Sequence, residues 1–383
     1  MSVLAPILVV LLTAAPALGA EGVSASEIVL GASTSLSGPR AFGGAQATKF
    51  GVDLYLRVVN AAGGIDGRKV RTVYHDDADV PDRAVANARK LVEEAGVLAL
   101  IVPQGERAIL ASLPYLEQQR VPLLFALGGS PTLRGRKYVF GATMLYDRQS
   151  RLMVDYLVGQ RKYRRFATLY QDDAYGRTFL TALASDLGRR GLRLVGSERL
   201  RQGESDVSDE IARLRALRPD VAFLISTPRP AGEVLKERLR VGWSETVIVA
   251  VGPLLDEGFL TVAGGVADGV EGLALWPDPL TSDLPGVKRY REHLAKHFPG
   301  TVPNRASLSG YVAAMLFTEG ARRAGPTLTR ESLVAALEGL KDFETGILPP
   351  VTIASDHETQ KQGFWVRMEQ GRFKPLTGWL PGK

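Results

Sequence analysis

The sequence predicts an α/β protein made of two doubly wound lobes, each a parallel sheet covered by helices on both faces. Three observations lead to this prediction. The chain has 383 residues, which is too many for one compact core and suggests about two domains. From residue 27, apolar runs rich in β-forming residues alternate with helical patterns, and near residue 166 the same alternation begins again.

The first run of alternation starts with "EIVLGAS" (27–33), which is typical of a strand. Residues 44–61 follow with apolar side chains at helical spacing, and the glycines of "AAGGIDGRKV" end that helix in a turn. A helix is also expected at about 81–94, because proline fits the first turn of a helix. The other expected elements of this run are the strands "VRTVYHDD", "VLALIVPQG" and "VPLLFALGG" and a helix at 106–119.

The second run starts with the strand "RFATLYQDD" and has expected helices near 175–190, 206–216 and 231–241. Its other expected strands are "LRLVGSERL", "VAFLISTP", "TVIVAVGP" and "VEGLALWP". Ligands of open parallel sheets bind beyond the carboxyl ends of the strands. Several strands end here in polar or glycine-rich segments, which predicts a ligand cleft between facing lobes: 33–35, 104–106, 128–130, 171–173 and 226–227.

The N-terminus is typical of a secretory signal peptide. It is almost wholly apolar from Val3 to Ala15 and then passes into small residues before Glu21, so cleavage is expected after Gly19 or Ala20. The alternatives are a buried helix or a membrane anchor, but the apolar run is short for a span and contains Pro6 and Pro16. We therefore expect residues 1–20 to be removed and the protein to lie free in the periplasm.

Composition and motifs argue against several classes of function. The 47 basic and 41 acidic residues are interspersed, so the net charge of +6 indicates a mixed surface rather than a nucleic-acid site. The chain has no cysteine, which excludes disulfides and a lipidated cysteine. It also lacks a phosphate-binding loop, a dinucleotide fingerprint and a nucleophile elbow. We therefore expect no enzyme activity, no cofactor and no metal.

Several segments, in order along the chain, resemble the periplasmic leucine/isoleucine/valine-binding family, the type I solute-binding proteins of ABC importers. The resemblance runs from about residue 27 to the end of the chain. It is carried by "STSLSGPRAFGGAQATKFGVDLYLRVVNAAGGIDGRKV", "LVEEAGVLALIVPQG", "EQQRVPLLF", "YDRQSRLMVDYL", "YQDDAYGR", "VADGVEGL" and "SDHETQKQGF".

The resemblance implies a periplasmic-binding-protein fold of type I, with two lobes joined by a three-crossover hinge. Lobe one would comprise 27–146 plus 277–347, and lobe two 147–276 plus 348–383. A small-molecule ligand would bind between the lobes, which close by hinge motion. The closed form would then meet a membrane permease, and the binding protein would act as a monomer.

Family members that bind α-amino acids hold the carboxylate with hydroxyl groups and backbone N–H groups of lobe one and the ammonium with an acid of lobe two. The corresponding lobe-one loops contain Gly105 and Glu106 in one case and Gly128, Gly129 and Ser130 in the other. The expected hydroxyl side chains are largely replaced there, although Ser130 remains. The lobe-two acid falls on Leu254, with Asp256 two residues later. A buried ammonium opposite Leu254 would lack its counter-charge, which is costly.

The sequence therefore favours a carboxylic acid without an α-ammonium, aromatic or otherwise hydrophobic. Arg229 would hold the carboxylate as a bidentate partner. The side chains of Phe42, Tyr175 and Trp276 would form apolar walls. Glu106 has three alternatives: a contact to a ligand hydroxyl or amine, a pair with Arg107, or exposure to solvent.

Each candidate also has a purely structural interpretation. Asp147, in "YDRQ", either touches the ligand or caps the next helix. Packing within or between the lobes is the alternative for Phe42, Tyr175 and Trp276, and solvent exposure for Arg229. Turn geometry alone explains glycines such as those of the lobe-one loops, which would otherwise let backbone N–H groups approach an anion.

Three functions follow from these expectations. The first is delivery of an organic acid to an ABC importer, with a branched-chain or other amino acid or amide as the competing ligand. The second is a periplasmic sensory component, which the same fold would serve. The third, an enzyme such as a hydrolase, lacks a recognisable nucleophile and base.

Overall fold

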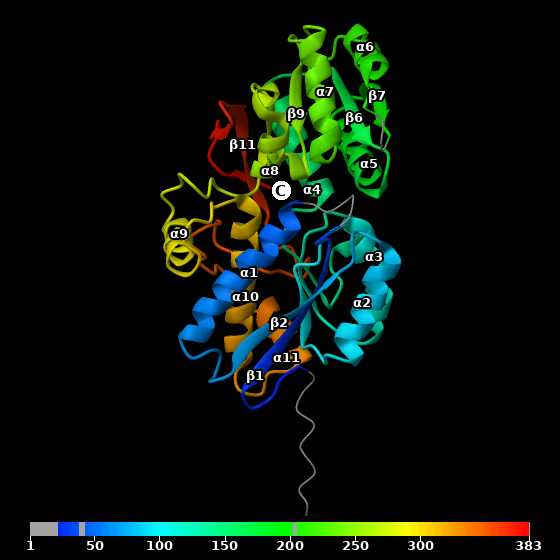
Figure 1. The fold of residues 1–383 in the computed structure, drawn as a ribbon. Coiled ribbons are helices and arrows are strands. Elements are labelled where there is room, and N and C mark those ends of the chain that lie inside the picture. The colour runs from blue at the N-terminus through cyan, green and yellow to red at the C-terminus, as the bar shows by residue number, and fades with distance from the viewer. Residues whose placement is uncertain (1–21, 38–42, 202–204, 383) are drawn as a thin grey trace, which may run out of the picture.

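The computed structural model describes residues 22–37, 43–201 and 205–382. Two sheets stacked along the long axis of the molecule form its two halves (Figure 1). The first is a five-stranded parallel sheet in the order β2-β1-β3-β4-β5. Its strands are β1 (Glu27–Thr34), β2 (Lys69–Asp76), β3 (Ala99–Ile101), β4 (Leu123–Ala126) and β5 (Val139–Gly141).

Helices cover both faces of the first sheet, as the alternating pattern predicts. One face packs against α2 (Pro81–Glu93) and α3 (Glu106–Gln118). The other packs against α1 (Gly43–Ala61), α9 (Pro285–His297), α10 (Arg305–Ala324) and α11 (Arg330–Glu338). We call this sheet with its helices lobe one.

The second sheet has eight strands and is parallel only in part. Its order is β12-β11-β10-β9-β8-β6-β7, with β13 paired to β11. The strands β6 (Phe166–Gln171), β7 (Leu194–Leu200), β8 (Val221–Ile225), β9 (Val247–Ala250) and β10 (Glu271–Ala274) are parallel. An antiparallel edge that the sequence analysis does not anticipate follows, made of β11 (Gln362–Glu369), β12 (Arg372–Pro375) and β13 (Leu380–Pro381).

Helices also cover both faces of the second sheet, and we call this unit lobe two. One face packs against α4 (Tyr146–Val154) with its π-helical continuation Asp155–Gln160, and against α5 (Ala174–Arg189). The other packs against α6 (Ser208–Ala216), α7 (Pro228–Arg240) and α8 (Glu257–Ala263). Helix α7 begins three residues before the expected 231, because prolines in a first turn cost no hydrogen bond.

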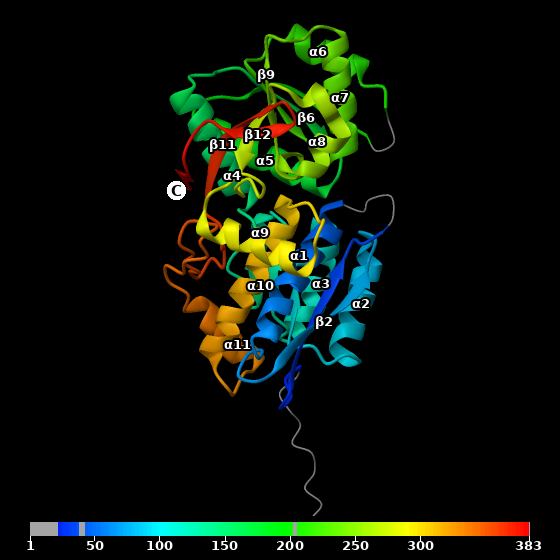
Figure 2. The same ribbon diagram turned by 60° about the vertical axis from the view of Figure 1, so that its left-hand side comes forward.

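The chain crosses between the lobes three times: between β5 and α4, between β10 and α9, and between α11 and β11 (Figure 2). This confirms the expected fold of two lobes with three crossovers. The exact lobe boundaries given above stay a prediction. The expected signal peptide (1–20) and Phe42 lie outside the described residues. Among the helices that the structure describes, none is long and apolar enough to cross a membrane.

Candidate functional site

A direct contact between the lobes lies at Glu106, the first residue of α3. This residue follows the carboxyl end of β3 in lobe one. The Thr178 hydroxyl on α5 of lobe two donates a hydrogen bond of 3.1 Å to Glu106 Oε1. Helices α3 and α5 therefore meet where strands of both sheets end, which is the edge that the sequence analysis selects for ligand binding (Figure 1).

Glu106 is buried at this contact, with 8% of its surface exposed. Its second carboxyl oxygen, Oε2, has no hydrogen-bond partner in the described part of the chain. Burial raises the pKa of Glu106 to about 7, although the Thr178 and Tyr146 hydroxyl groups favour the ionised form. The charge of Asp173 raises the pKa further. Of the three alternatives for Glu106, exposure to solvent is therefore excluded, and Arg107 pairs with Asp79 instead (3.4 Å).

Two tyrosines enclose this carboxyl group. Tyr146 starts α4 at the first crossover, and its ring centroid lies 5.5 Å from that of Tyr175 at the start of α5. The Tyr175 hydroxyl donates to the Val251 carbonyl at 3.2 Å. Burial raises the pKa of both tyrosines, so both side chains stay neutral. Tyr146 is a site candidate that the sequence analysis misses, although it directly precedes Asp147 in "YDRQ".

Close packing limits the space for a side chain at the glycines of the lobe-one loops. A side chain on Gly129 would place its Cβ 2.0 Å from Cε1 of Tyr146. Gly105 has a φ of +93°, and a Cβ there would lie 2.6 Å from Asp79 Oδ1. At Gly128 the corresponding atom would meet the Ile109 side chain at 3.0 Å. The structural interpretation accounts for these three glycines without a ligand.

The Ser130 side chain makes its hydrogen bonds within its own loop. Its buried hydroxyl contacts that of Thr132 at 2.9 Å and caps the short 3₁₀ turn Pro131–Leu133. Two other buried polar atoms at the strand ends of lobe one lack a hydrogen-bond partner within the described residues, namely Oγ of Ser35 and Oε1 of Gln104. Unpartnered buried polar atoms are uncommon in native proteins and mark places where a ligand or water completes the hydrogen bonding.

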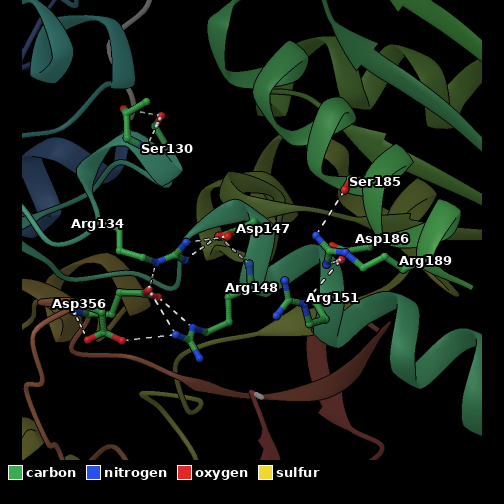
Figure 3. A network of polar contacts seen from close by, with 11 residues as sticks. Ser130, Arg134, Asp147, Arg148, Arg151, Ser185, Asp186, Arg189 and Asp356 are labelled. Carbon is green, nitrogen blue, oxygen red and sulfur yellow. Dashed lines mark hydrogen bonds and ion pairs between the residues drawn. The ribbon is translucent and has the colours of Figure 1, made fainter.

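Asp147 is held in an ion network at the crossovers (Figure 3). Arg134 donates to both of its oxygens, at 2.8 and 2.9 Å. Arg134 also reaches Glu358, which Arg148 contacts from the other side at 3.1 Å. The network therefore ties the first crossover to the third and leaves the Asp147 carboxylate engaged. Asp147 does not cap α4, because it is the second residue of that helix and the cap position, Leu145, makes no side-chain cap bond; Oδ1 of Asp147 accepts instead from the neighbouring Arg148 N–H at 2.9 Å.

The remaining candidates lie in different environments. Leu254 is fully buried in the core of lobe two. Trp276 packs against the core of lobe one, and its carbonyl accepts from Arg305 Nε at 3.3 Å. Arg229 is exposed on the first turn of α7, just beyond the carboxyl end of β8, and makes no polar contact within the described residues. Tyr175 and Glu106 are thus the predicted residues that the structure brings together. Gly129 packs against the ring of Tyr146 beside them.

Within the described part of lobe two, four carboxylates at this edge already accept a hydrogen bond or pair with an arginine. Asp172 pairs with Arg177 at 2.6 Å, and Asp173 caps α5 through the Gly176 N–H at 3.1 Å. Asp256 caps α8 through the Gly258 N–H at 2.7 Å. Glu257 accepts from the backbone N–H and the guanidinium of Arg305 in lobe one. Leu254 contributes no charge, so an ammonium here would have to share a carboxylate that already caps a helix or pairs with an arginine.

A separate cavity of ≈ 290 Å³ lies among helices α1, α9 and α10 of lobe one, with Tyr55, Arg289 and Tyr311 in its lining. None of the predicted site residues lines it. In the described part of the chain, no cluster of three or more histidine, cysteine or acidic residues could hold a metal ion.

Comparison with known proteins places the chain in context. The family described as "Periplasmic binding protein" matches residues 27–372. "Leu/Ile/Val-binding protein homolog 3" of Brucella melitensis is 24% identical over 336 residues, which cover 87% of this chain and 89% of the relative. An "Amino acid binding protein" of Pseudomonas aeruginosa is 28% identical over 245 residues, or 63% of this chain. That match spans 64% of the relative, which is less than two thirds of its length.

Solved structures share the fold over nearly the whole chain. A branched-chain amino acid transporter component of Thermus thermophilus with bound valine has a TM-score of 0.84 and 18% identity, and the match covers 95% of this chain and 97% of that one. A solute-binding protein of R. palustris in complex with benzoate has a TM-score of 0.80 and 17% identity, with coverage of 93% and 97%. At these identities the likeness establishes the fold alone.

Proposed function

Because the chain belongs to the periplasmic binding protein family, we propose that it captures a small organic acid between its lobes and delivers it to the permease of an ABC importer. The acid carries a hydrophobic or aromatic group and has no α-ammonium. The protein acts without chemistry on its ligand, in the periplasm and as a monomer. The fold has been solved with valine in one protein and with benzoate in another, so it suits carboxylates with and without an ammonium.

The observation that carries the proposal is the state of the lobe-two carboxylates. An α-amino acid brings an ammonium that needs a free, ionised acid when it is desolvated. Four acids among the described residues of lobe two at this edge cap helices or pair with arginines, and Leu254 is buried in the core. A ligand without an ammonium makes no such demand.

Two features support recognition of the ligand itself. Arg229, exposed beside the end of β8, supplies a cation that can swing to a carboxylate. The rings of Tyr146 and Tyr175 provide apolar walls against which a hydrophobic group can pack. Glu106 is the feature that favours the competing ligand, an amino acid or amide, because an ionised carboxyl group there would accept a hydrogen bond from an amine.

Thermal unfolding of the mature protein with a library of ligands tests the proposal. The library contains aromatic and aliphatic carboxylates, amides and amino acids. A ligand at 100 times its dissociation constant stabilises the folded state by about 2.7 kcal/mol, which shifts the melting temperature visibly. Stabilisation by carboxylates with silent amino acids supports the proposal. A shift with leucine or valine, and none with simple acids, would overturn it.

A further inference from the structure

We propose that Glu106 binds the ligand carboxylate as a protonated acid, so that capture of one ligand takes up one proton. This inference rests on the proposed function and adds the way in which the site recognises its anion. It concerns a group that is shared between the lobes, since Glu106 belongs to lobe one and receives its hydrogen bond from Thr178 of lobe two.

The first argument is the hydrogen bonding of the two carboxyl oxygens. Oε1 accepts from Thr178 at 3.1 Å, whereas Oε2 is buried without a hydrogen-bond partner among the described residues. A protonated carboxyl group carries one O–H donor in addition to its acceptors. With the proton on Oε2, Glu106 keeps its contact to Thr178 and presents a donor to the ligand. A carboxylate is the natural acceptor for that donor.

The second argument is the set of charges around Glu106. From α4 it faces Tyr146, and from the start of α5 it faces Tyr175 and the carboxylate of Asp173. On its own helix, Arg107 is turned to Asp79, donating to the Asp79 carbonyl at 3.0 Å and pairing with its carboxylate at 3.4 Å. Within the described residues, Glu106 has no ion pair with a lysine, arginine or histidine. Burial and the charge of Asp173 favour the uncharged acid, and they outweigh the Tyr146 and Thr178 hydroxyl groups, which favour the ionised form.

The third argument concerns lobe closure. When the lobes separate, Glu106 loses Thr178 and its cover, and its pKa returns toward that of a solvated glutamate, about 4.3. In this structure, where the two lobes meet at Glu106, burial raises its pKa to about 7. An anionic ligand at Oε2 raises it further, because two neighbouring carboxylates cannot both stay ionised cheaply. Between these two pKa values, closure on the ligand therefore takes up a proton.

The coupling between ligand binding and protonation of Glu106 determines whether the ligand affinity rises or falls with pH. A group whose pKa rises on binding makes the affinity fall as pH rises, by up to about tenfold per pH unit between the two pKa values. Above the pKa of the bound state the affinity becomes constant. The opposite sign is expected if ionised Glu106 instead accepts a hydrogen bond from an ammonium, since acidification then removes the acceptor. The sign therefore identifies which group of the ligand faces Glu106.

Isothermal titration calorimetry of the full mature chain tests this inference, with benzoate, octanoate and L-leucine as probes between pH 5.5 and 7.5. Titrations in buffers of different ionisation enthalpy count the protons exchanged. We expect benzoate or octanoate to bind with uptake of close to one proton at pH 6. Their Kd should rise about tenfold from pH 5.5 to 6.5.

Three variants isolate the role of Glu106. Glu106→Gln should bind the acid with a Kd that is nearly independent of pH and with no proton uptake. Thr178→Val, which removes the lobe-two donor, should weaken binding and retain proton uptake. The matched control Glu117→Gln, at the other end of α3 and paired with Arg136, should behave like the natural protein.

The outcomes separate the two proposals. Binding of benzoate or octanoate with a constant Kd and no proton uptake overturns the role of Glu106 and leaves the proposed function standing. Unchanged proton uptake in a folded Glu106→Gln variant also overturns that role. Binding of leucine alone, with a Kd that falls as pH rises, overturns both proposals. Failure of both acids to bind at any pH counts against the proposed function, and the inference then falls with it.

Discussion

The backbone N–H of Arg305, in lobe one, donates a hydrogen bond of 2.9 Å to the carboxylate of Glu257, in lobe two, and the guanidinium of Arg305 binds the same carboxylate. The Arg305 side chain is 5% exposed and lies over the ring of Phe373, 4.4 Å from its centroid. The start of α10 is thus inserted between α8 and β12 of the other lobe. Like Glu106 with Thr178 and Arg134 with Asp147, this pair is a polar contact between the lobes.

Replacing Glu257 with glutamine should weaken the closed arrangement of the lobes. A buried guanidinium that loses its carboxylate costs about 1–3 kcal/mol. When the lobes open, we expect water to solvate Arg305, so the substitution destabilises only the closed form. The apparent ligand affinity should therefore fall about 5- to 150-fold. Small-angle scattering should show a more extended ligand-free molecule. Glu233→Gln, which removes a surface pair with Lys236 on α7, is the control and should change neither property.

Asp147 should make a pH-dependent contribution to stability. Burial acts to raise its pKa, but the hydrogen bonds and charge of Arg134 outweigh burial and lower it. A lowered pKa means that the stabilisation is fully present above the unfolded value, about 3.9, and is lost as pH falls through the folded value. We expect Asp147→Asn to cost about 1–2 kcal/mol at pH 6, and less at pH 2.5.

Urea unfolding at both pH values measures this difference. Asp155→Asn, which removes a more exposed pair with Arg190, is the control and should cost little at either pH. A cost of Asp147→Asn that is equal at pH 6 and pH 2.5 would show that the ion network does not depend on the charge of this residue.

The sequence pattern predicts the layers of this fold well because strands and helices that pack on a sheet leave local periodicities of two and 3.6 residues. The strand at 27–33 and the helix at 44–61 are found within two residues as β1 and α1. The antiparallel edge is missed because its strands, such as "QGFWVRME", have no flanking helices to mark an alternation. Pairing direction depends on where the third crossover returns, which the local pattern does not encode.

The candidate site is harder to predict, because the burial and packing of its residues depend on contacts between segments that are distant in the sequence. Gly129 is required by Tyr146, which arrives from the next helix. Glu106 is buried at a contact with the other lobe, from which Thr178 donates a hydrogen bond to it. Leu254 could be assigned a position in the resemblance, but its burial depends on how the short turn Gly252–Leu255 packs beneath α8. Residue type and spacing alone carry none of this information.

Gly129→Ala should destabilise the protein and disturb the site. The added Cβ would lie 2.0 Å from a ring carbon of Tyr146, so the ring must move. Overpacking of this kind costs about 1–3 kcal/mol, and displacement of Tyr146 should also weaken ligand binding. Gly188→Ala, in an exposed part of α5 with nothing near the new Cβ, is the matched control. It should stabilise the protein by about 0.5–1 kcal/mol. Equal effects of the two changes would contradict the packing of Tyr146 on Gly129.

Leu254 tests whether this position contributes to binding or to folding. Its side chain is fully buried in the apolar core of lobe two, together with Leu255 and Phe259. Truncation to alanine should leave a cavity and cost about 2–5 kcal/mol, measured as the free energy of unfolding in urea. Leu239→Ala, at a leucine that is 68% exposed, should cost less than about 0.5 kcal/mol.

Ligand titration of the folded Leu254→Ala protein completes this test. Because the structure places the side chain in the core, the affinity for the captured acid should change less than about threefold, while stability falls sharply. A stable Leu254→Ala variant that loses affinity would mean that the side chain faces the ligand. The same result would strengthen the case for a ligand without an ammonium, because an apolar side chain would then line the site where a desolvated ammonium needs a carboxylate.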